Sequence, residues 1–67
     1  MEKLLIELAN EYGLQKDTFL TAAEKGCEIL FNQKLNELVE NIGDNKEELE
    51  VTLLLCVNVG LLDKERN

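Results

Sequence analysis

The segment from Val51 to Leu62 constrains the fold of this chain most, because it reads VTLLLCVNVGLL and contains no charged residue. On a helix, its apolar residues would point in nearly every direction around the axis, which is typical of a helix enclosed by other protein on all sides. A chain of 67 residues forms a small core, which rarely stabilises a fold without a disulfide, a metal or an oligomer. The sequence therefore predicts that a second copy of the chain completes the core.

The two cysteines, Cys27 and Cys56, do not form a CxxC pair, and the chain contains no histidine. One chain therefore cannot assemble a zinc knuckle or a zinc finger. With no histidine to activate a thiol, both cysteines are predicted to be reduced and buried as small hydrophobic residues. We expect no metal and no cofactor.

Seven basic and 14 acidic residues give the chain a net charge of −7. This charge repels nucleic-acid backbones and anionic membrane surfaces. The N-terminus, MEKLLIELAN, lacks the pattern of an export signal because Glu7 interrupts its apolar stretch. The apolar segment 51–62 is shorter than the roughly 17–25 residues that span a bilayer. We therefore expect a cytoplasmic protein.

Helical periodicity runs through most of the chain. It predicts a first helix over residues 2–12, ended by Gly13 in a Schellman motif with an apolar contact from Leu14. A second helix is predicted over residues 18–42. Gly26 could break this helix, but a continuous helix is favoured because the apolar spacing continues through Gly26. Its apolar stripe comprises Leu20, Ala23, Cys27, Phe31, Leu35, Leu38 and Ile42.

A third helix is predicted over residues 45–62, because Asp44 and Glu47 have the spacing of a capping box. Residues 63–67 are expected to be a solvated tail. The strict alternation of apolar residues over 49–61 also fits a long strand, but a strand would have no partner within the chain, so a helix is favoured.

Together these patterns predict a single all-α domain, residues 1–67, built as a three-helix bundle, or as a four-helix bundle if Gly26 breaks the second helix. We expect Phe31, Leu35 and Leu38 in the middle of the core. We expect homo-oligomerisation to complete the core through an interface centred on Leu53, Leu54, Leu55 and Val57.

Residues 7–26, ELANEYGLQKDTFLTAAEKG, carry small and apolar residues at the spacing of a tight two-helix corner: Ala9, Gly13, Leu14 and Phe19, with Leu8, Tyr12 and Ala22 at further packing positions. The segment resembles the helix-turn-helix of phage-repressor-type transcription regulators. The resemblance implies that the second helix presents Gln15, Lys16, Asp17, Leu20, Thr21 and Glu24 outward, where a DNA reader would contact its duplex.

Two acidic residues and a leucine on that outward face suit a protein partner better than phosphates and base edges. The chain has no HExxH motif, no Ser/His pair and no phosphate-binding glycine loop, so we expect no enzymatic activity. We expect a small acidic regulatory or inhibitory protein, acting as a homodimer that binds another protein. Two alternatives are a helix-turn-helix DNA-binding regulator and an acidic mimic of nucleic acid. The predicted partner-binding residues are Lys16, Asp17, Leu20, Thr21 and Glu24.

Overall fold

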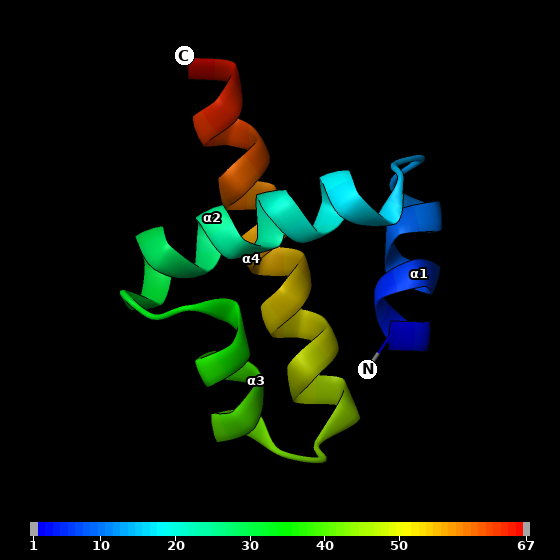
Figure 1. Cartoon of the computed structure of the whole chain (residues 1–67), viewed down its shortest axis with the longest axis vertical. Coiled ribbons are helices and arrows are strands. Elements are labelled where there is room, and N and C mark those ends of the chain that lie inside the picture. Colours follow the sequence, from blue (N-terminus) through cyan, green and yellow to red (C-terminus); the bar gives the residue numbers. More distant parts are fainter. Residues whose placement is uncertain (1, 67) are drawn as a thin grey trace.

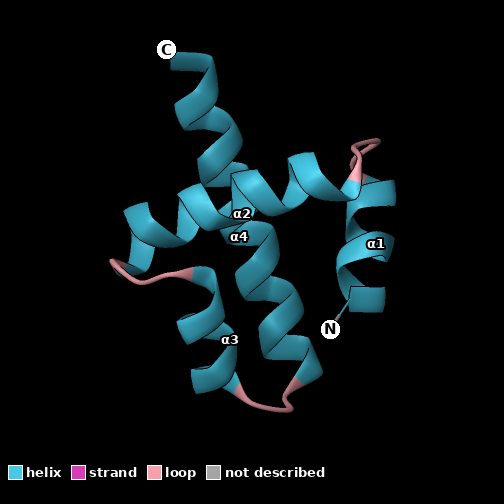
Figure 2. Cartoon of the chain, viewed as in Figure 1, coloured by secondary structure: helices cyan, strands magenta, loops and turns pink. Residues whose placement is uncertain are grey.

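The computed structural model describes the backbone of residues 2–66 and the side chains of residues 2–63. These residues form helices and no strand (Figure 2). The helices are α1 (Glu2–Glu11), α2 (Lys16–Phe31), α3 (Leu35–Ile42) and α4 (Lys46–Arg66). In Figure 1, α2 crosses in front of α4, and α1 and α3 lie on either side of the N-terminal half of α4. The predicted all-α fold is confirmed, with four helices in the part of the chain that the structure describes.

The turn after α1 has the hydrogen bonds of a Schellman motif, as the sequence predicts. The N–H of Leu14 donates to the carbonyl oxygen of Ala9 (2.9 Å), and the N–H of Gly13 donates to that of Asn10 (3.0 Å). Gly13 has a φ of +68°, which a glycine adopts without a steric penalty. This turn sets the direction in which the chain enters α2.

The segment predicted as one helix over 18–42 forms two helices. α2 passes through Gly26 without a break, and the chain instead leaves the helix at Asn32, whose φ is +55° and whose N–H donates to the carbonyl oxygen of Glu28 (3.2 Å). Asparagine is one of the few residues besides glycine that adopts this left-handed conformation readily. Apolar spacing did not reveal the break, because Leu35 continues the same spacing from α3.

Helix α4 starts and ends differently from the prediction. Asn45, and not Asp44, caps it: the N–H of Glu48 donates to Asn45 Oδ1 (3.2 Å). The helix continues to its end at Arg66, so residues 63–66 of the predicted tail are helical, and Asn67 lies outside the described residues. No helix in the described chain combines the length and apolar character needed to cross a membrane.

The core lies where α2 crosses α4, and all four helices contribute to it. Phe31, predicted in the middle of the core, is 40% exposed because the last turn of α2 extends beyond the residues that α4 covers. Leu35 and Leu38 are buried as predicted. The other buried apolar residues are Leu4, Leu5, Leu8 and Ala9 of α1, Phe19, Ala22, Ala23 and Cys27 of α2, and Leu49, Leu53, Cys56 and Val57 of α4.

Helices α2 and α4 make the most extensive contact in the molecule, and at two points their backbones touch. A Cβ on Gly26 would lie 1.7 Å from the carbonyl oxygen of Cys56, and one on Gly60 would lie 2.0 Å from that of Ala22. Only glycine fits at either position, since real Cβ atoms do not approach a backbone oxygen so closely. The two glycines fix where the helices cross, and Figure 1 shows the C-terminal end of α4 extending past α2.

Candidate functional site

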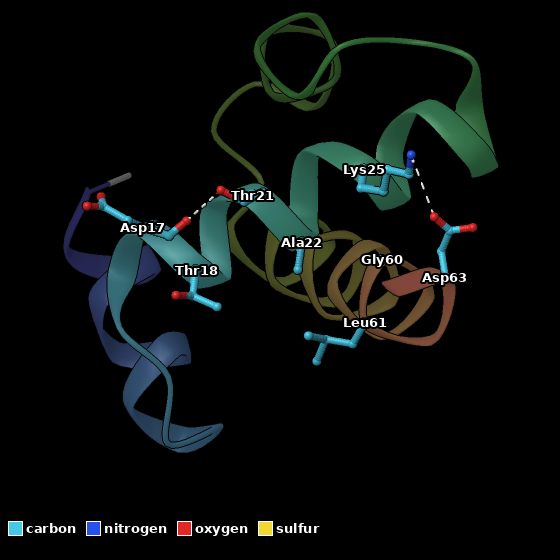
Figure 3. Close-up of a pocket in the computed structure, with 8 residues that line it drawn as sticks. All are labelled: Asp17, Thr18, Thr21, Ala22, Lys25, Gly60, Leu61 and Asp63. Carbon is cyan, nitrogen blue, oxygen red and sulfur yellow. Dashed lines mark hydrogen bonds and ion pairs between the residues drawn. The ribbon is translucent and has the colours of Figure 1, made fainter. Parts of the chain in front are cut away.

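A groove of about 440 Å³ lies between the N-terminal part of α2 and the C-terminal part of α4. It exists because the two helices touch at Ala22 and Gly60 and then diverge. In Figure 3, the side chains of Thr18, Ala22 and Leu61 point into the space between the two helices. The residues that line the groove are Asp17, Thr18, Thr21, Ala22, Lys25, Gly60, Leu61 and Asp63.

The groove combines an apolar floor with charged side chains at its edge. Lys25 Nζ lies 3.6 Å from Asp63 Oδ2 and so links the two walls. The hydroxyl of Thr21 donates a hydrogen bond to the backbone carbonyl oxygen of Asp17 (2.9 Å), so the hydroxyl hydrogen already has an acceptor within α2. No described residue forms an ion pair with the exposed carboxylate of Asp17. That carboxylate is therefore free to meet a cationic group of a partner.

The five predicted partner-binding residues all belong to α2, and two of them line the groove. Asp17 and Thr21 line the groove, but Glu24 is exposed beside a smaller hollow at the start of α3. Leu20, expected to be an exposed anchor, is half-buried and packs against the core. A polar substitution of Leu20 would therefore disturb the core as well as any docking surface.

Lys16, the fifth predicted residue, already has a partner within the chain. Its Nζ lies 2.7 Å from Oε1 of Glu2, which joins the first turn of α2 to the start of α1. The hydrogen bond from Lys16 lowers the pKa of the Glu2 carboxyl below its usual value, and the same bond raises the pKa of Lys16. A partner that used Lys16 would have to replace this contact.

Sequence reasoning missed the α4 side of the groove. Leu61 and Asp63 are far from α2 along the chain, and only the crossing brings them beside it. A usable signal was present, because each helix has two small residues spaced by four: Ala22 with Gly26 in α2, and Cys56 with Gly60 in α4. Such spacing puts small residues on one helix face, where another backbone can approach closely.

The residues predicted at the oligomer interface lie on different sides of α4. Leu53 and Val57 are fully buried in the core of the single chain, so they are not available to a second copy of the folded chain. Leu54 is half-buried, and Leu55 is exposed. The single chain therefore encloses one face of the apolar segment, which the sequence argument assigned to a partner.

The two cysteines face each other in the core, with their Sγ atoms 3.0 Å apart. Burial raises the pKa of the Cys27 thiol to about 12, with a further contribution from its hydrogen bond with Cys56, and burial also raises the pKa of Cys56. Because the thiolate is the reactive form, neither cysteine is suited to act as a nucleophile in the folded protein.

We predict that neither Cys27 nor Cys56 in the native protein reacts with an aromatic disulfide reagent at pH 8 on the timescale of minutes. Both should react within seconds after unfolding in guanidinium, which supplies the matched control on the same chain. The release of the coloured thiol product measures both rates. Fast reaction of either thiol in the native protein would show that the cysteines are not enclosed as described.

A second hollow of about 490 Å³ lies between α1, the end of α3 and the start of α4. Its charged residues are two basic ones, Lys3 and Lys46, and two acidic ones, Glu7 and Asp44. Among the described residues, no group of three or more metal-binding side chains is placed to hold a metal ion.

A scan against protein-family models found no matching family, and searches of curated proteins and of solved structures found no matching protein.

Proposed function

We propose that this protein is a small acidic regulator or inhibitor that acts as a homodimer and binds another protein at the groove between α2 and the end of α4. The observation that carries the proposal is the composition of that groove. Ala22 and Leu61 line it with apolar groups, the Lys25–Asp63 pair joins its two walls, and the exposed Asp17 lies at the N-terminal end of α2. Protein interfaces characteristically bury an apolar anchor in such a hollow and surround it with polar groups.

The charge of the protein indicates the chemistry of the partner. A net charge of −7 attracts basic surfaces and speeds their encounter. The partner segment that fits the groove carries one apolar side chain, which packs on Leu61, and a lysine or arginine, which reaches Asp17. By covering that basic segment, the protein would prevent its other interactions.

DNA binding is the second candidate function. It is supported by the tight turn at Gly13 between α1 and α2, which is the feature that resembles a helix-turn-helix. A protein partner is favoured because Asp63 adds a carboxylate beside α2 and pairs with Lys25, one of the few cations on that helix. Both effects weaken attraction to phosphates.

We predict that Asp17→Lys and Thr18→Arg each weaken partner binding by about tenfold or more, because the first reverses the rim charge and the second fills the groove. Both residues are exposed, so the helical circular dichroism should not change. Glu37→Lys is the matched control, since it makes the same charge change at an exposed site on α3 and should bind normally. The measurement is quantitative capture from a lysate of the native host, followed by titration of the captured protein.

If the unsubstituted protein and the three variants captured the same amount of partner, the groove would not be the docking site. Sequence-selective and salt-sensitive binding to a DNA duplex, lost on Lys16→Ala or Thr21→Ala, would overturn the proposal in favour of the DNA-binding regulator.

A further inference from the structure

The two cysteines of this chain meet where α2 crosses α4. Cys27 belongs to α2 and Cys56 to α4, their Sγ atoms lie 3.0 Å apart, and both side chains are fully buried. The sequence contains no other cysteine. Because the two sulfur atoms of a disulfide are about 2.0 Å apart, a shift of about 1 Å would bring these thiols to bonding distance. The pair therefore lies close to the geometry of a disulfide.

The backbones beside the two thiols also approach as closely as a disulfide requires. A disulfide joins residues whose Cα atoms are about 4.4–6.8 Å apart. The residue before Cys27 is Gly26, and a Cβ on it would lie 2.7 Å from the Cα of Cys56 and closer still to its carbonyl oxygen. The backbone of α2 therefore touches that of Cys56. This contact is independent of the positions of the sulfur atoms and fits a bond between the helices.

The enclosure of the pair selects an internal disulfide over other oxidised forms. Both thiols belong to the apolar core, and neither is exposed. A core packed as densely as a crystal has no room for a bulky group, such as glutathione, attached to one sulfur. An internal disulfide removes two hydrogen atoms and adds no volume. The folded chain therefore favours the internal bond over a mixed disulfide.

We propose that Cys27 and Cys56 form a reversible disulfide, which joins α2 to α4 when the protein meets a low-molecular-weight disulfide such as oxidised glutathione. The bond would join positions 29 residues apart and close a loop that contains the end of α2, all of α3 and the first half of α4. Closing such a loop restricts the unfolded chain, so the disulfide stabilises the folded form. This modification site does not depend on the homodimer or on the docking groove.

The oxidation proceeds by two thiol–disulfide exchanges. One cysteine loses its proton to water, and its thiolate attacks a sulfur of the small disulfide, whose S–S bond breaks; one small thiolate leaves and takes up a proton. The other cysteine then loses its proton and attacks the cysteine sulfur of the mixed disulfide, and the second small thiolate leaves and takes up a proton. In sum, two cysteine thiols are oxidised to one disulfide, and one small disulfide is reduced to two thiols.

Opening of the crossing between α2 and α4 limits the rate of this reaction. Burial raises the pKa of the Cys27 thiol to about 12 and separates both thiols from the reagent. The first exchange therefore takes place in molecules in which the two helices have separated, and refolding then brings the two sulfurs together. Low concentrations of urea, which increase the open fraction, should speed the reaction.

The test compares formation of the disulfide in the folded and in the unfolded full-length chain. The protein is equilibrated with reduced and oxidised glutathione, starting from the dithiol and from the disulfide, both without denaturant and in guanidinium. After an acid quench, intact mass spectrometry measures the dithiol, the mixed disulfides and the internal disulfide. The equilibrium constant for the internal disulfide should be about 100-fold or more higher in the folded chain, which is also the factor by which the bond favours folding.

Thermal unfolding supplies a second measurement. The oxidised protein should melt about 10 °C or more above the dithiol form. Cys56→Ala is the matched control, because it cannot form the bond and should melt at the same temperature in oxidised and in reduced glutathione. Each protein is compared with itself, so a lower stability of the variant does not affect the result. If Cys56→Ala does not fold, Cys27→Ala is the equivalent control.

Equal equilibrium constants in the folded and unfolded chains, or an oxidised protein that melts no higher than the dithiol form, would overturn the proposal. So would a folded protein that carries mainly glutathione adducts or disulfides between two chains, since the two sulfurs would then not meet within one chain. These measurements need no partner protein, so their failure is distinct from failure of the docking groove.

Discussion

Replacing Gly26 by alanine is expected to destabilise the protein by about 3 kcal/mol or more and to unfold much of it at room temperature. The added Cβ would lie 1.7 Å from the carbonyl oxygen of Cys56, so α2 and α4 would have to move apart along their whole contact. The sign of the effect is informative, because alanine in place of glycine otherwise stabilises a helix by about 1 kcal/mol. Urea unfolding followed by circular dichroism measures the change.

Glu28→Ala is the matched control for Gly26→Ala, because Glu28 is exposed on the same helix. It should leave the free energy of unfolding almost unchanged. Gly60→Ala should destabilise the protein as Gly26→Ala does, since its Cβ would meet the backbone of Ala22. A higher melting temperature for Gly26→Ala than for the unsubstituted protein would show that the two helices do not cross at this distance.

Shortening Leu35 to alanine is expected to cost about 2–5 kcal/mol of stability, the usual range for a large apolar side chain removed from a packed core. Leu35 is 2% exposed at the start of α3 and anchors that short helix to the core. A domain of this size has little stability to lose, so the variant should be partly unfolded without denaturant. Thermal unfolding followed by circular dichroism measures the loss.

Two further variants test the placement of the core. Glu40→Ala, at an exposed position of α3, should leave the melting temperature almost unchanged. Phe31→Ala should cost less than Leu35→Ala, because Phe31 is partly exposed, whereas the sequence alone placed both residues in the middle of the core. If Leu35→Ala and Glu40→Ala melted at the same temperature, the assignment of the faces of α3 would be wrong.

The features that were predictable from sequence are those that neighbouring residues determine. Glycine followed by an apolar leucine after the first helix predicted a Schellman turn, and Gly13 and Leu14 form one. The end of α2 was not predictable in this way, because an asparagine such as Asn32 adopts both helical and left-handed conformations. The left-handed conformation of Asn32 reverses the chain after α2, and Leu35 at the start of α3 then lies in the core.

The position of the groove and the exposure of Val51, Leu55 and Leu62 depend on which face of α4 meets α2, and composition does not reveal that face. Leucine and valine occur all around the helix, so Leu53 and Leu55 look equivalent in the sequence although one is buried and the other exposed. The small residues decide between them, because only the face with Cys56 and Gly60 lets α2 approach. The sequence argument considered only the apolar coverage of this segment and did not use Gly26 and Gly60 as contact points, so it placed the interface on both sides of the helix.

The contact between α2 and α4 at Gly26 and Gly60 forms with little loss of side-chain conformational entropy. Glycine has no side chain, and alanine and cysteine have short ones, so ordering these residues freezes few rotamers. Closely packed backbones still gain many dispersion contacts. We therefore expect the amide hydrogens of α2 and α4 around this crossing to exchange with solvent more slowly than those of any other part of the described chain. The last turns of α4 extend past α2, so their amide hydrogens should exchange faster than those of the rest of α4.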